Sequence, residues 1–121
     1  MIELDVTTDR GIAVVVPRGR LNMVAARQLR QVLADIITGG TSRIVVDLAE
    51  TTFLDSSGLG ALIGGLKSAR QAGGDLRIAR PTPEVMTVFT LTNMDKVLRP
   101  RDDVGSAFEV LVAIDRKPFG R

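Results

Sequence analysis

Apolar and polar positions alternate over the first residues of the chain. Ile2, Leu4 and Val6 are separated by acidic residues, which is the period-2 pattern of a strand with one buried face. Residues 8–11 form a turn signal, and the continuous apolar run of residues 12–16 follows it. A run of this kind is typical of a strand that is buried on both faces. The two segments therefore predict an antiparallel hairpin.

Beyond the hairpin, helical spacing and strand-like runs follow one another. Apolar residues at i, i+3, i+4 and i+7 begin at Leu29 and again at Leu59, and each run ends at a pair of glycines. Asn22 stands where an N-cap of the first helix is expected. Strand-like runs lie at residues 44–48 and 76–78. Strands that alternate with helices predict an α/β fold with right-handed crossovers.

The last third of the chain predicts two further helices and a short edge strand. Thr82 followed by proline marks a helix start, and residues 97–98 suggest an edge strand. Asp102 or Asp103 can cap a last helix, whose buried face would comprise Val104, Phe108, Leu111 and Val112. We expect one domain over residues 1–121, with a mixed sheet of about four to five strands opened by the hairpin and about four helices.

Composition excludes most kinds of catalysis. The 121 residues include no cysteine and no histidine, which removes thiol nucleophiles, imidazole metal sites and Ser-His-Asp triads. We therefore expect no enzyme, no cofactor and no metal ion. The net charge is only +2 and the chain has no Trp or Tyr, whereas a nucleic-acid-binding surface is typically strongly basic and carries aromatic residues for stacking. No apolar stretch approaches the ~18 residues of a membrane span, so we expect a cytoplasmic protein that contacts neither nucleic acid nor membrane.

The glycines of the second long helix do not form a nucleotide-binding loop. A dinucleotide fingerprint that starts at Gly58 would need a glycine where Ile63 stands. A P-loop that ends at Gly65 would need lysine next, but Leu66 follows. Close packing of the helix against the sheet explains these glycines better than a nucleotide-binding enzyme does.

The residues just before this helix carry the most informative pattern. Asp55, Ser56 and Ser57 follow a short segment, residues 51–54, and open the helix. One interpretation is that Ser56 or Ser57 is simply the N-cap. The other is that one hydroxyl stays exposed at the helix start, where free N–H groups and the helix dipole can hold a phosphate. The local pattern leaves both open.

The same run resembles the signature of a known family. Residues 45–48, V-V-D-L, and residues 52–62, T-F-L-D-S-S-G-L-G-A-L, are similar to the anti-sigma factor antagonists, whose domain is called STAS. Residues 19–22, 72–76 and 91–98 also resemble family turns and helix ends, so that the similarity covers nearly the whole chain.

The resemblance implies a bacterial regulator that works by binding. In such proteins the unmodified form captures an anti-sigma factor and so frees a sigma factor. The anti-sigma factor is itself a serine kinase that phosphorylates the antagonist, and a serine phosphatase reverses the reaction. The matching position makes Ser56 the phosphoacceptor. The region expected to bind the partner comprises Asn22, Asp55, Ser57, Gly58 and Leu59.

One departure from the family pattern bears on the mechanism. Asn22 replaces the aspartate that the family usually has in this turn. Asn22 either acts only as an N-cap or lacks a charge that assists phosphorylation. The alternative function is a STAS domain that is never phosphorylated and serves as a scaffold in a signalling or membrane transport assembly.

Overall fold

The computed structural model describes residues 2–105, 107 and 108. Within them the chain forms five strands and four helices, which confirms the predicted mixed α/β fold. In chain order these are β1 (Glu3–Asp9), β2 (Ile12–Leu21), α1 (Met23–Thr38), β3 (Arg43–Asp47), β4 (Thr51–Leu54), α2 (Ser56–Gln71), β5 (Asp75–Ala79), α3 (Pro83–Leu91) and α4 (Asp95–Leu98).

Strand β2 organises the sheet. It pairs with β1 as the predicted antiparallel hairpin, and its first half pairs in parallel with β3, which in turn pairs with β5. Its last residues pair in parallel with β4, so that Leu21 lies opposite Leu54. Along its ten residues, β2 thus pairs first with β3 and then with β4, both on the same side.

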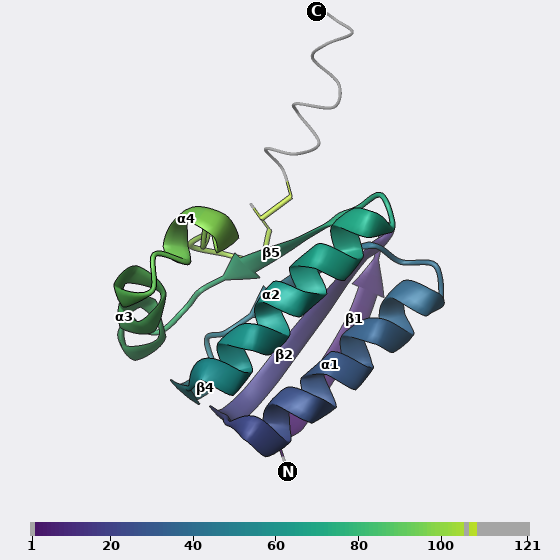
Figure 1. Ribbon diagram of the computed structural model, residues 1–121. Coiled ribbons are helices and arrows are strands. Elements are labelled where there is room, and N and C mark those ends of the chain that lie inside the picture. Colours follow the sequence, from purple (N-terminus) through teal and green to yellow (C-terminus); the bar gives the residue numbers. More distant parts are fainter. Residues whose placement is uncertain (1, 106, 109–121) are drawn as a thin grey trace, which may run out of the picture.

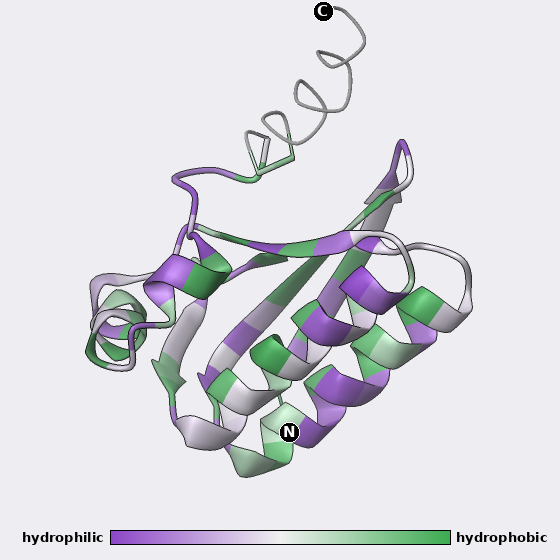
Figure 2. Ribbon diagram, turned by 45° about the horizontal axis from the view of Figure 1, so that its top comes forward, coloured by the Kyte–Doolittle hydropathy of each residue, from purple (hydrophilic) through white to green (hydrophobic). Residues whose placement is uncertain are grey.

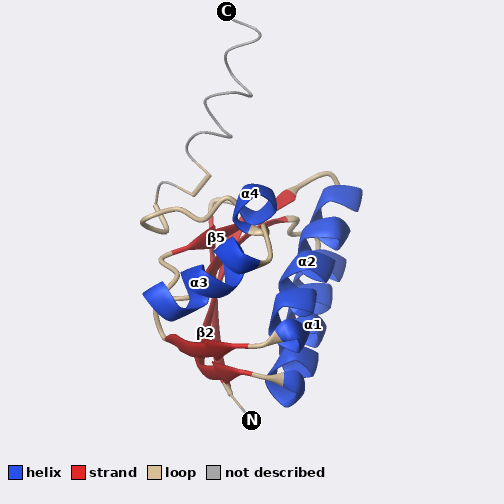
Figure 3. Ribbon diagram, turned by 60° about the vertical axis from the view of Figure 1, so that its left-hand side comes forward, coloured by secondary structure: helices blue, strands red, loops and turns tan. Residues whose placement is uncertain are grey.

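The two long helices cover one face of the sheet. Helices α1 and α2 lie side by side on that face, while α3 packs against β4 and α4 lies against β5 (Figures 1 and 3). Both long helices mix hydrophilic and hydrophobic residues along their length (Figure 2), as amphipathic helices do. The main core lies between these helices and the sheet, and its largest members include Leu21, Leu29, Leu62, Ile78 and Phe89.

The structure corrects two predicted elements. Residues 97–98 are not an edge strand but the end of α4, where the N–H of Leu98 donates to the carbonyl of Met94. The segment that lies beside β5 is the next one, since Arg101 bridges to Ala79. Residues 102–105 form no helix, and Leu111 and Val112 lie outside the described residues.

Candidate functional site

Two helices begin next to each other at one edge of the sheet. Leu21 and Leu54 are register partners in the parallel strands β2 and β4, and the chain enters a helix directly after each of them. Asn22 and Asp55 are therefore neighbours at the carboxyl ends of these strands. Figure 1 shows the starts of α1 and α2 at this same end of the molecule.

Both residues cap their helices. The Oδ1 atom of Asn22 accepts a hydrogen bond from the N–H of Ala25 at 3.1 Å, which confirms the predicted cap of α1. The Oδ1 atom of Asp55 accepts one from the N–H of Gly58 at 3.0 Å. The N-cap of α2 is thus Asp55 and neither serine, because Asp55 has the extended backbone of a cap and Ser56 is the first helical residue. Asp and Ser cap equally well, so local preference could not decide between them.

The capping role of Asp55 leaves both serine hydroxyls unused. Ser56 is exposed and Ser57 is half-buried. Within the part of the chain that the structure describes, neither hydroxyl makes a hydrogen bond. Two serines at the positive end of a helix, one of them open to solvent, can therefore react or bind without loss of the cap.

Gly58 brings the two helix starts together. A Cβ atom on Gly58 would overlap the carbonyl oxygen of Leu21 and lie 2.7 Å from Cδ1 of Leu54. Real Cβ atoms essentially never approach so closely, so any side chain here would push α2 away from β2. Gly58 is buried, and its lack of a side chain permits the close approach of α2 to β2.

Exposed apolar side chains lie at the start of α1, beside the start of α2. Met23 and Val24, in the first turn of α1, have exposed fractions of 59% and 56%, and Leu59 is half-buried. On the strands that lead into the site, the guanidinium of Arg20 lies 4.2 Å from the ring centre of Phe53. Met23, Val24, Arg20 and Phe53 were not predicted. In the sequence, the pattern that points to Met23 and Val24 is that both are apolar but lie outside the buried stripe of α1.

The structure places all six predicted site residues at this edge of the sheet. Asn22 comes from the β2–α1 junction, and Asp55, Ser56, Ser57, Gly58 and Leu59 come from the β4–α2 junction. Among the described residues, no group of three or more acidic side chains could hold a metal ion. No helix in the described part of the chain has both the length and the apolar character needed to cross a membrane.

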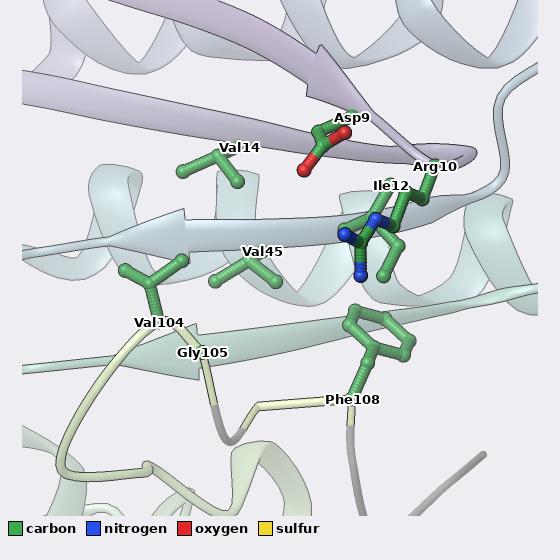
Figure 4. Close-up of a pocket in the computed structure, with 8 residues that line it drawn as sticks. All are labelled: Asp9, Arg10, Ile12, Val14, Val45, Val104, Gly105 and Phe108. Carbon is green, nitrogen blue, oxygen red and sulfur yellow. The ribbon is translucent and has the colours of Figure 1, made fainter.

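A separate cavity lies near the other end of β2. Its volume is about 270 Å³, and its lining comes from the β1–β2 turn, from neighbouring strands and from Val104, Gly105 and Phe108 (Figure 4). The walls are mainly apolar, with Asp9 and Arg10 as the charged residues. This cavity contains none of the predicted site residues.

A family model decides what kind of domain this is. The model of the STAS domain matches residues 3–107, which is most of the chain. The chain belongs to the STAS domain family.

Relatives within the STAS family are named as anti-sigma factor antagonists. The anti-sigma-B factor antagonist of Staphylococcus aureus is 27% identical over 97 residues, which are 80% of this chain and 90% of the relative. A crystal structure from Thermotoga maritima, described as a candidate anti-sigma factor antagonist, is 25% identical with a TM-score of 0.82 and covers 88% of this chain and 92% of its own.

A third similar STAS protein has been solved in two chemical forms. The unphosphorylated form of the anti-sigma factor antagonist SpoIIAA is 25% identical, has a TM-score of 0.71, and covers 96% of this chain and 95% of its own. The phosphorylated form of SpoIIAA, from Bacillus, has a TM-score of 0.66 at 24% identity and thus shares the fold. STAS anti-sigma factor antagonists are regulators and not enzymes, which agrees with the expectation drawn from the missing histidine and cysteine.

Proposed function

We propose that this chain is an anti-sigma factor antagonist that binds an anti-sigma factor while Ser56 is unmodified and releases it once Ser56 is phosphorylated. The observation that carries the proposal is the exposed hydroxyl of Ser56, which opens α2 but does not cap it. A kinase can reach this hydroxyl without unfolding the helix start. The names of the STAS relatives support the choice of partner.

The start of α2 tolerates a phosphate. Phosphorylation adds about −1.5 to −2 charge at pH 7 together with several acceptor oxygens. The Asp55 carboxylate occupies the N–H of Gly58, while the N–H groups of Ser56 and Ser57 remain at the helix terminus. These groups and the helix dipole favour an anion. The modified protein therefore keeps its fold.

The same phosphate opposes binding of the partner. We expect the partner to cover Ser56 together with Met23 and Val24, which are exposed apolar side chains at the neighbouring helix start. In the complex the phosphate would lose water beside the Asp55 carboxylate. Like charges brought together at an interface can cost several kcal/mol, and each ~1.4 kcal/mol lowers affinity tenfold. A loss of affinity by two or more powers of ten needs no change of fold.

Two partners and one compartment belong to this function. The anti-sigma factor is also the serine kinase, and a serine phosphatase restores the unmodified Ser56. Because sigma factors act in the cytoplasm, we place the protein there. Asn22, in the position of the family aspartate, is the feature that favours the alternative, a STAS scaffold that is never phosphorylated.

The test combines three variants. Ser56→Ala removes the phosphoacceptor, Ser56→Asp introduces a charge, and Ser57→Ala is the matched control. Since neither hydroxyl has a hydrogen-bond partner among the described residues, the free energies of unfolding of the two alanine variants should lie within ~0.5 kcal/mol of that of the wild type. The anti-sigma factor is obtained by co-purification from the host and incubated with each variant and Mg-ATP.

We expect one phosphate on the wild type and on Ser57→Ala, located on Ser56 by peptide mapping, and none on Ser56→Ala. Ser56→Ala should bind the anti-sigma factor as the unmodified protein does, and Ser56→Asp should bind much more weakly. Phosphorylated protein that binds as tightly as unmodified protein would contradict the switch. Co-purification of a transporter complex in place of a kinase would favour the scaffold.

A further inference from the structure

An arginine of α1 reaches across to α2 near the serine pair. The Nη2 atom of Arg30 lies 3.0 Å from the position that a Cβ atom on Gly60 would occupy. That separation is shorter than nine in ten real Cβ contacts, so the guanidinium occupies space that is open because residue 60 is glycine. Arg30 therefore lies against α2 at Gly60, about one turn after the helix starts.

The direction of the Arg30 side chain follows from helix geometry. Arg30 stands eight residues after the cap Asn22, or ~12 Å along α1, while Gly60 stands five residues after the cap Asp55, or ~7.5 Å along α2. The two helices start together and run side by side (Figure 1). Because side chains lean toward the N-terminus of their helix, Arg30 reaches back toward the start of α2.

Gly60 shares one surface of α2 with both serines. Ser56 and Ser57 precede it by four and three residues, which are the spacings of neighbours on a helix. Neighbours of this kind have Cβ atoms ~5–6 Å apart. A small rotation of the Arg30 side chain would thus bring its guanidinium to a phosphate on Ser56.

Arg30 is also available to bind a new anion, in contrast to several other arginines. Arg18 pairs with Asp5, Arg70 with Asp75, and Arg80 with Asp47. Arg30 is exposed and, within the described residues, makes no ion pair. Its movement toward a new anion would therefore break no existing pair.

We propose that Arg30 binds the phosphate of phosphorylated Ser56, an inference that rests on the phosphorylation proposed above. The planar guanidinium can hold two phosphate oxygens with two parallel N–H groups, a fixed geometry that a lysine ammonium lacks. A positive charge bound to the phosphate lowers its second pKa, which is ordinarily about 6. Arg30 thereby keeps the phosphate doubly charged near neutral pH, and the full charge strengthens release of the partner.

The test measures the phosphate directly. Phosphoserine is installed at position 56 during synthesis of the full chain, and its second pKa is followed by ³¹P NMR in the wild type and in Arg30→Gln. Lys67→Gln is the matched control, because Lys67 is an exposed cation of α2 that lies 11 residues, or ~16 Å, beyond Ser56. Arg30→Lys tests whether charge alone suffices.

We expect Arg30→Gln to raise the pKa of the phosphate by about 0.5, the effect of a unit charge roughly 5 Å away in water. Lys67→Gln should leave the pKa unchanged, and Arg30→Lys should give an intermediate value. An Arg30→Gln protein that is folded, as judged by its melting curve, but has the wild-type pKa would overturn the proposal. Because phosphoserine is installed without a kinase, this result leaves the phosphorylation of Ser56 by a kinase to its own test.

Discussion

Within one turn at the start of α2, neighbouring residues make different contacts. Asp55 satisfies a backbone N–H, Ser56 faces solvent, and Gly58 touches the carbonyl of Leu21. The helix period separates Ser56 from Gly58, because residues two positions apart point about 200° apart around the axis. Chemistry at Ser56 is thereby separated from the contacts that hold the helix in place.

Two glycines of α2 should respond in opposite ways to alanine. Gly58→Ala places a methyl group against backbone and against Leu54, and we expect a loss of stability of about 1–3 kcal/mol or more. Gly64→Ala meets nothing within 4 Å and should gain about 0.5–1 kcal/mol, since alanine favours a helix. Urea unfolding of both variants measures the difference, and equal effects would show that Gly58 is not closely packed.

Asn22 offers a test of charge at the site. Asn22→Asp should keep the cap of α1 and change the unfolding free energy by only a few tenths of a kcal/mol. If a negative charge here assists the kinase, the initial rate of phosphorylation of Ser56 should rise. Asn93→Asp makes the same charge change at an exposed turn residue outside the site and serves as control. An unchanged rate in Asn22→Asp would indicate that Asn22 acts as a cap only.

At the scale of elements, an ion pair fastens the end of β3 to the loop after β5. Asp47 is buried, and its two carboxylate oxygens accept from Nε and NH2 of Arg80 at 3.1 Å and 2.6 Å. The hydrogen bond and charge of Asp47 raise the pKa of Arg80. Arg80 has a left-handed φ of 52°, so the pair also holds the loop in a conformation that non-glycine residues rarely adopt.

Asp47→Asn should weaken this connection between elements. The substitution keeps the size of the side chain but removes its charge, and the amide nitrogen of Asn cannot accept from the guanidinium of Arg80. One of the two hydrogen bonds is therefore lost and the other is weakened, where a hydrogen bond to a charged group is worth about 1.5–3 kcal/mol. We expect a loss of about 1–3 kcal/mol in chemical unfolding. Asp5→Asn breaks the exposed pair with Arg18 and should cost less than ~1 kcal/mol. Similar losses in the two variants would argue against a special role for the buried carboxylate.

At the scale of the whole molecule, the switch should act with the fold unchanged. Phosphate at Ser56 lies at the starts of α1 and α2, whereas α4 packs against β5, away from these helix starts (Figure 3). We therefore expect ¹H–¹⁵N NMR shifts of phosphorylated protein to change at residues 20–30 and 54–62 and to stay constant in β1, β5 and α4. Widespread shifts, or a large fall in melting temperature, would indicate that release of the partner depends on a change of fold.

The sequence alone determined which segments become helices and strands where the periodicity is long or the end signals are strong. The stripes that begin at Leu29 and Leu59, with a cap before and glycines after, predicted α1 and α2 correctly. The same is true of the hairpin and of Thr82 with its proline at the start of α3. These signals are local, so each segment carries its own information.

Only the tertiary structure decided the features that depend on neighbours. Residues 97–98 were too short a segment for periodicity to separate strand from helix, and packing made them the end of α4. Local preference could not choose between Asp55 and the serines as the cap of α2, whereas the folded backbone did. The pairing of Leu21 with Leu54 and the reach of Arg30 to Gly60 join segments 30 or more residues apart. Such contacts are set by the sheet register and by the packing of helices, which no local pattern encodes.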